Sequence, residues 1–167
     1  PLHYGGESAV LGVITDITDR RRMEEALRES EARLAALMDN APLVVHLKDR
    51  AGRYLLANPE SAKIFGREPA AVIGSTARDV FPPDEADQID QHHAEVLSTG
   101  KTVFYEEYQP SLGEYQWSMV IRFPIRDARG EIAVVGCLAL DITERKRAEA
   151  EVKASAARFR AIAEIHP

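Results

Sequence analysis

The stretch EIAVVGCLALDITERKR, Glu131 to Arg147, determines how the rest of the chain is organised. It begins as an apolar, β-branched run, which predicts a buried strand. The triplet Asp141-Ile142-Thr143 follows, and then a charged run with helical character. Thr143 is a residue that favours a helix N-cap, and Glu144 suits the positive end of a helix. A strand therefore ends here, and a helix leaves the domain.

The same transition occurs 125 positions earlier, in VLGVITDITDRRR, Val10 to Arg22. The match continues along the following helix, and Pro42 is matched by Pro167. Self-similarity at a fixed period indicates an array of like domains. We therefore expect the terminal hairpin and strand of a preceding unit, a connector helix, one whole unit, and a connector helix leading to a next unit, at residues 1–18, 19–40, 41–142 and 143–167.

Both connectors have heptad spacing. The first repeats at Met23, Leu27, Ser30, Leu34 and Leu37, and the second at Ala148, Val152, Ser155, Phe159 and Ile162. A period of 3.5 residues is typical of a coiled-coil seam. Seams this short are weak alone, so we expect each helix to pair with its counterpart in a homodimer. The alternative is an amphipathic helix that packs on its own domain.

Composition limits the partners and the compartment. The 167 residues suit one ordinary domain with extensions, and the net charge of −6 argues against nucleic acid as a partner. The single cysteine, Cys137, excludes an internal disulfide and fits a reducing compartment. No apolar run reaches the roughly 18 residues of a membrane span. We expect a cytoplasmic piece of a longer protein, without direct membrane contact.

Within the whole unit, alternation and turn residues predict two strands, several short helices, one longer helix and three further strands. Short hairpin loops make the sheet antiparallel, and the helices must then cover one face. The predicted class is α+β. The strands are expected at 43–48, 53–57, 102–109, 115–125 and 131–142, and the helices at 58–66, 68–73 and 84–97.

This pattern resembles the PAS family of sensory domains. The resemblance rests on HLKDRAGRYLLANPESAKIFG (46–66), IGSTARDVFPP (73–83), VLSTGKTVFYEEY (96–108), FPIRDARGEIAVVG (123–136) and LDITERKRAE (140–149). It implies a five-stranded sheet in the order 2-1-5-4-3, with short helices enclosing a small pocket against one face. It also implies a sensory role in a bacterial signalling protein, such as the histidine kinase of a two-component system or a diguanylate cyclase.

The resemblance to flavin-binding members indicates which strand faces line the pocket. The residues expected there are Val44, His46, Phe104, Glu106, Tyr108, Ser118, Val120, Arg122, Cys137 and Ala139. Composition alone would put the opposite faces of the last two strands inside. Buried charges need partners, so we expect Glu106 and Arg122 to pair with each other or with an anionic group of a small polar metabolite.

The opposite face would carry Trp117, Met119, Ile121 and Phe123, which are too apolar to leave in water. We expect the helix of residues 22–38 to cover it, from the same chain or from a partner. The expected signal relay is Asp141, Thr143 and Arg145. Asp141 and Arg145 are four residues apart and are placed to form the joint itself.

No catalytic motif is present, so we expect a regulatory domain whose parent protein holds any catalytic activity. We expect no metal and no cofactor other than an unidentified small polar or anionic metabolite. Haem would need an axial histidine, for which His93 is the candidate. A photochemical flavin would need a cysteine where Ala77 stands. The alternatives are a ligand-free dimerisation and spacer module and, after it, a haem or flavin sensor. Expected partners are a second copy and the neighbouring PAS and output domains.

Overall fold

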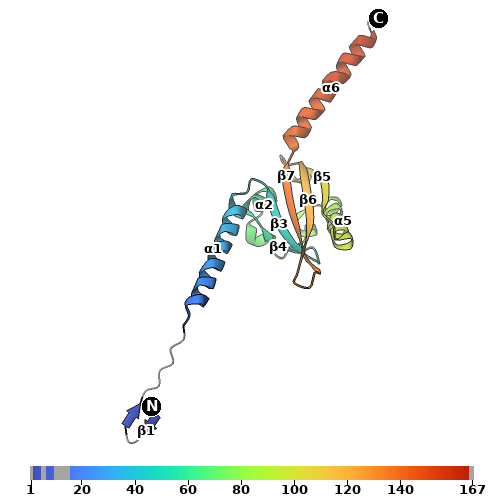
Figure 1. Ribbon diagram of the computed structural model, residues 1–167. Coiled ribbons are helices and arrows are strands. Elements are labelled where there is room, and N and C mark those ends of the chain that lie inside the picture. Colours follow the sequence, from blue (N-terminus) through green and yellow to red (C-terminus); the bar gives the residue numbers. More distant parts are fainter. Residues whose placement is uncertain (1, 5–6, 10–15, 166–167) are drawn as a thin grey trace. The chain divides into compact units, whose positions relative to one another are not determined.

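The computed structural model describes residues 2–4, 7–9 and 16–165, with side chains described from residue 16 to residue 160 (Figure 1). The chain divides into two units, Pro1–Leu37 and Met38–Pro167. The first contains a two-stranded sheet of β1 (Leu2–Tyr4) and β2 (Glu7–Ala9). The exit strand expected at residues 10–15, and the matching Pro167, lie outside the described residues.

The second unit is built on a five-stranded antiparallel sheet. Its strands are β3 (Val44–Asp49), β4 (Tyr54–Ala57), β5 (Val103–Tyr108), β6 (Trp117–Arg126) and β7 (Ile132–Asp141). Their spatial order is β4-β3-β7-β6-β5, which confirms the predicted order 2-1-5-4-3. The last strand in sequence, β7, is thus the central strand of the sheet. The centre of the sheet is therefore continuous with the C-terminal connector (Figure 1).

The segment between β4 and β5 folds into helices that pack against the sheet. They are α2 (Pro59–Ile64), α3 (Pro69–Val72), α4 (Ala77–Val80) and α5 (Pro83–Thr99), and a 3₁₀ turn, η1 (Pro110–Leu112), follows β5. Asn58 fixes the start of α2, because its Oδ1 accepts hydrogen bonds from the backbone N–H groups of Ser61 and Val45. Gly100 ends α5 in the left-handed conformation, with φ of 64°.

The two faces of the sheet differ from what composition alone would give. Val120 and Arg122 of β6, and Val135 and Cys137 of β7, are buried under the helices. The larger apolar residues of β6, Trp117, Met119, Ile121 and Phe123, are only half-buried on the other face. The inner face is therefore the one indicated by the family resemblance.

Gly136 of β7 allows an aromatic ring to lie against the backbone on the outer face. Gly136 is paired with Phe123 of β6, and a Cβ added at Gly136 would lie 2.5 Å from two atoms of the Phe123 ring. Any larger residue at position 136 would push the ring away from the sheet.

We expect Gly136→Ala to lower the free energy of unfolding by about 1–3 kcal/mol, the usual cost of overpacking. Urea unfolding followed by circular dichroism measures it. Phe123→Leu removes the ring, so the double variant should lose less than the two single variants together. A Gly136→Ala variant as stable as the wild type would show that the Phe123 ring does not pack against Gly136.

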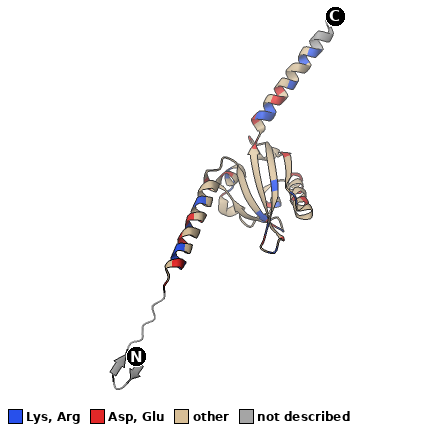
Figure 2. Cartoon of the chain, in the orientation of Figure 1, with Lys and Arg blue, Asp and Glu red and all other residues tan. Residues whose placement is uncertain are grey.

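The two connectors are long helices with an exposed apolar stripe. They are α1 (Thr18–Asn40) and α6 (Thr143–Ile165), with charges of both signs along each (Figure 2). The exposed stripe residues are Met23, Leu27, Leu34, Leu37, Val152 and Phe159. No residue of α1 is buried. The pairing of these helices, and the covering of the outer sheet face by α1, therefore stay predictions.

Among the described residues, no helix combines the length and the apolar character needed to cross a bilayer.

Candidate functional site

A small cavity lies between the inner face of the sheet and the helices that cover it. Its volume is about 30 Å³. Ligand pockets usually enclose about 300–1,000 Å³, so this cavity has room for roughly one water molecule. Its wall is mostly apolar, with polar side chains from His46, Tyr54, Glu107, Gln109, Ser118 and Arg122.

Seven of the expected pocket residues line this cavity. They are Val44 and His46 of β3, Ser118, Val120 and Arg122 of β6, and Cys137 and Ala139 of β7. The predicted position of these side chains is therefore correct for the first, fourth and fifth strands. Whether they bind a ligand stays a prediction.

The expectation for the third strand, β5, was wrong by one residue. Phe104, Glu106 and Tyr108 are exposed, the first by 64% and the last by 45%. They stand opposite the outward-facing residues of β6, whereas Tyr105 and Glu107 stand opposite the inward-facing Val120 and Ser118. Residues paired across antiparallel strands share a face, so β5 turns Tyr105 and Glu107 inward.

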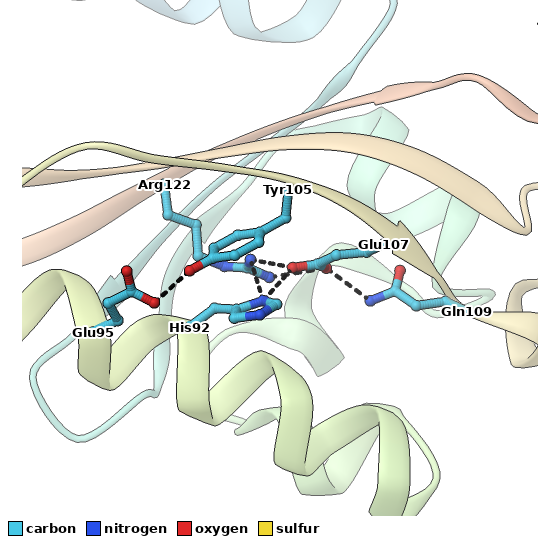
Figure 3. Close-up of polar contacts among 6 residues, drawn as sticks. All are labelled: His92, Glu95, Tyr105, Glu107, Gln109 and Arg122. Carbon is cyan, nitrogen blue, oxygen red and sulfur yellow. Dashed lines mark hydrogen bonds and ion pairs between the residues drawn. The ribbon is translucent and has the colours of Figure 1, made fainter.

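Glu107 is the centre of a buried polar network (Figure 3). It forms a two-pronged ion pair with Arg122, in which Nη1 contacts Oε1 and Nη2 lies 3.1 Å from Oε2. His92 Nδ1 lies 2.7 Å from Oε1, and Gln109 Nε2 lies 3.3 Å from Oε2. A carboxylate only accepts hydrogen bonds, so His92 carries its proton on Nδ1. The predicted Glu106–Arg122 pair is thus replaced by Glu107–Arg122.

His92 extends this network to α5. By helical spacing His92 shares a side of α5 with Glu85 and Glu95, and yet it is buried against β5. Its ring stacks on Tyr105, with centroids 3.6 Å apart and planes 7° apart. The Tyr105 hydroxyl in turn donates to Glu95 of α5 (Figure 3). Strand β5 is therefore attached to α5 through two of its inward-facing residues.

The network keeps Glu107 ionised inside the protein. Burial by itself raises the pKa of this carboxyl, but hydrogen bonds from His92 and Arg122 outweigh burial and lower the pKa to about 2. Arg122 is buried as well, and its pKa is raised in spite of burial, with Glu107 among the causes. The two charges thus neutralise each other.

His46 lines the cavity and Lys48 packs on Tyr54, another wall residue, and neither has such a partner. Lys48 Nζ and His46 Nδ1 are buried and make no hydrogen bond among the described residues. Lys48 Nζ lies 4.3 Å from the ring centroid of Tyr54, and the His46 ring packs edge-on to the same ring at 5.0 Å. Burial lowers the pKa of Lys48 to about 8 and lowers the pKa of His46 well below its ordinary value.

The joint between β7 and α6 is fixed by backbone and side-chain hydrogen bonds. Asp141 Oδ1 accepts the backbone N–H of Thr143 at 2.8 Å. Thr143 is buried, and its Oγ1 accepts the backbone N–H of Trp117 at 3.0 Å. The backbone N–H of Ile142 donates to the Trp117 carbonyl at 2.8 Å. The start of α6 is therefore attached to the first residue of β6.

A second attachment of α6 comes from β5. The expected Asp141–Arg145 pair is not formed, because Arg145 turns to Glu106, with Nη2 2.5 Å from Oε1. Lys146 contacts Oε2 of the same carboxylate, and its Nζ lies 5.1 Å from the ring centroid of Trp117. Glu106 thus lies outside the pocket where it was expected, and it pairs with the exit helix.

Comparison with known proteins identifies the family. The family profile described as PAS fold matches residues 38–147. The chain belongs to the PAS family. The five-stranded order and the covering helices described above are those of this fold.

This PAS domain matches parts of longer proteins, several of which are named as signalling proteins. The uncharacterized protein y4lL of Sinorhizobium fredii is 33% identical over 141 residues, which are 82% of this chain and 17% of that protein. Further relatives are named as a two-component sensor, sensor histidine kinases and a diguanylate cyclase. The chain spans between 11% and 40% of the length of such relatives. It is therefore similar to a regulatory part of multidomain sensors.

Solved structures share the fold. The PAS domain of BvgS from Bordetella pertussis superposes with a TM-score of 0.59 at 23% identity, covering 76% of this chain and 98% of that one. VqmA bound to DPO gives a TM-score of 0.60 at 22% identity, covering 66% of this chain and 57% of that one.

The cofactor candidates of this PAS domain are placed as follows. His93 is buried on α5, and its ring nitrogens approach the backbone of Asp49 and Arg50 outside hydrogen-bond geometry. Cys137 is buried in β7, where burial raises the pKa of its thiol. The described residues contain no group of three or more metal-binding side chains. Haem and flavin are far larger than a 30 Å³ cavity.

Several residues of the site are not among those that the sequence predicts. Lys48 was identifiable, because it follows Val44 and His46 at alternate positions of one strand and so shares their face. Glu107 and His92 had no such signal. β5 carries an aromatic residue and a carboxylate on each face, and His92 stands among polar neighbours along α5.

Proposed function

We propose that this PAS domain is a sensory module that converts a change at its cavity into a change in how α6 leaves the domain. The observation that supports this most directly is the pair of adjacent carboxylates on β5. Glu107 faces the cavity and holds Arg122, whereas Glu106 faces outward and holds Arg145 and Lys146 of α6. One strand thus contacts both the input and the output.

The first step of the relay is at the network around Glu107. A ligand that competes for Arg122 or moves His92 changes the hydrogen bonds that attach β5 to α5. These bonds form in a buried site, where a lost partner is costly, so the network favours discrete arrangements over gradual ones. β5 then shifts along or away from β6.

The second step is at the exit joint. A shift of β5 moves Glu106 and so pulls on the first turn of α6 through Arg145 and Lys146. The hydrogen bonds of Asp141 and Thr143 hold the start of α6 to the end of β7 and to β6, so this point acts as the pivot. In a parallel helix pair, this motion becomes a rotation or a change of register that a distant output domain reads. By analogy with the named relatives, the output is a histidine kinase or a diguanylate cyclase.

A rival function is a ligand-free dimerisation and spacer module. The specific observation in its favour is the cavity of about 30 Å³, which is nearly filled by the domain's own side chains. On the other side, VqmA shares this fold and was solved bound to DPO, so by analogy a pocket in this fold can hold a molecule. Native mass spectrometry of the purified chain separates the two: a bound small molecule supports the sensor, and an empty dimer supports the spacer.

The relay through β5 predicts that Glu106→Gln changes output without unfolding the domain. With the whole chain fused through α6 to a histidine kinase catalytic region, we expect the autophosphorylation rate to change by at least about fivefold, a typical coupling between sites. The reason is that the amide no longer holds both cations of α6. The melting temperature should stay near that of the wild type, because Glu106 is on the surface.

The matched control is Glu60→Gln, which breaks an ion pair with Lys63 inside α2, away from the exit joint. This variant should leave the autophosphorylation rate unchanged. Equal rates for the wild type and Glu106→Gln would remove β5 from the relay.

A further inference from the structure

The buried charges of the inner face do not cancel. Glu107 accepts hydrogen bonds from Arg122, His92 and Gln109, so its negative charge is already compensated. Lys48 lies on the same face and is 3% exposed, with no hydrogen bond to Nζ among the described residues. A buried charge without a partner is costly, so such groups are normally paired. The uncompensated cation of the inner face is therefore Lys48 and not Arg122.

A second buried group without a partner lies beside it. His46 is two residues before Lys48 on β3, is 7% exposed, and leaves Nδ1 without a hydrogen bond. Both side chains pack on the ring of Tyr54, which lines the cavity. His46 is thus itself a wall residue of the cavity, and Lys48 reaches the cavity wall through its contact with Tyr54. The ammonium and the imidazole both carry N–H groups that can donate hydrogen bonds.

Apart from the Glu107 network and Ser118, the rest of the cavity wall is apolar. Its apolar residues come from the helices, the sheet and η1, and include Phe65, Phe81, Ile89, Leu112 and Val120. Apolar surface of this kind favours a hydrocarbon body, and it would not replace the hydration shell of a phosphate or a sugar. Phe65 and Leu112 are only half-buried, so they are the side chains whose movement can enlarge the cavity.

We propose that the pocket takes a small apolar carboxylic acid, with its carboxylate accepting hydrogen bonds from Lys48 and His46 and its hydrocarbon body against Phe65 and Phe81. This inference rests on the proposed sensory function and names the ligand class. It also changes the expected anion-binding residue, because Arg122 is already paired with Glu107. The carboxylate of the acid supplies the anionic partner that the Lys48 ammonium lacks.

The test is a binding titration of the whole chain with two acids, butyrate and benzoate, and with their neutral amides, butyramide and benzamide. Isothermal calorimetry at pH 7 gives the affinities. We expect each acid to bind at least about tenfold more tightly than its amide, since a charge-assisted hydrogen bond is lost in the amide. Lys48→Met should abolish this difference, and Lys48→Arg should retain part of it.

The matched control is Lys101→Met, which removes an exposed lysine and should leave all four affinities unchanged. Lys48→Met should melt no lower than the wild type, because it replaces a buried unpaired ammonium by an apolar group of similar size. A loss of acid binding in a variant that melts normally therefore reports the contact and not the fold.

Three results would overturn the proposal: no binding of either acid, equal binding of acids and amides, or full acid binding by Lys48→Met. These outcomes differ from a failure of the proposed function, because the Glu106→Gln measurement needs no ligand. If Glu106→Gln changes the autophosphorylation rate as expected and neither acid binds, the ligand class is rejected and the relay through β5 is kept.

Discussion

Replacing Arg122 by methionine is expected to lower the free energy of unfolding by about 3–5 kcal/mol at pH 7, the usual cost of leaving one charge of a buried pair alone. Glu107, 1% exposed, would keep His92 and Gln109 but lose both guanidinium contacts. The apolar methionine side chain offers nothing in exchange. Urea unfolding followed by tryptophan fluorescence and circular dichroism measures the loss.

Two further variants distinguish the loss of the buried ion pair from the mere loss of an arginine side chain. Arg122→Met with Glu107→Gln removes both charges, so we expect it to recover most of the loss. Arg78→Met breaks an exposed ion pair with Asp87 and should change stability little. If Arg122→Met were as stable as Arg78→Met, Glu107 and Arg122 would not form a buried pair in solution.

The Arg122 effect has a pH dependence with a definite sign. Glu107 has a lowered pKa of about 2 against 4.5 for the free group, so its contribution is fully present above pH 4.5. It is lost as the pH falls from 4.5 towards 2. The difference between the wild type and Arg122→Met should therefore shrink over this acidic range.

Lys48 gives the second large effect, in the alkaline range. Its pKa falls from 10.5 to about 8 on folding, so between these values the unfolded chain binds more protons than the folded one. The wild type should then gain about 3 kcal/mol relative to Lys48→Met as the pH rises from 8 towards 10.5. Paired urea unfolding of both proteins at several pH values measures this gain.

Other charged and titratable groups surround Lys48. They are present in both the wild type and Lys48→Met, so the difference between the two proteins isolates Lys48. They are His46 of β3, Tyr54 of β4, Asp90 and His93 of α5, Glu107 of β5, Arg122 of β6 and Cys137 of β7. Lys101→Met, at an exposed lysine, is the control and should show the pH profile of the wild type. A parallel profile for the wild type and Lys48→Met would mean that Lys48 is not buried as an ammonium.

The strand order was predictable because the connections decide it. Short turns at Gly52 and Gly130 force antiparallel neighbours, and the family resemblance supplied the long crossover that places β7 in the centre. The inner face of β7 was also predicted, in spite of its small residues. The larger Leu138 and Leu140 lie on the outer face, where Gly136 leaves space for Phe123.

The candidate site was less predictable, because β5 has no alternation. Phe104 and Tyr105 are both aromatic, and Glu106 and Glu107 are both acidic, so either register fits hydrophobicity equally well. Only the pairing with β6 decides which carboxylate meets Arg122. Because β5 turns Glu107 inward, Glu106 faces outward and pairs with Arg145 of α6. No local pattern in the sequence of the exit helix indicates this pair.

The two carboxylates of β5 differ in how they meet dissolved ions. Glu107 and Arg122 are 1% and 5% exposed, so added salt does not reach them, whereas the Glu106 side chain is 35% exposed and Arg145 47%. Mobile ions weaken exposed pairs and leave buried pairs almost unchanged. The ionic strength of the surroundings therefore adjusts how firmly α6 is held while the cavity network stays the same. In the proposed relay, a rise in ionic strength would thus weaken the action of β5 on α6 without any ligand.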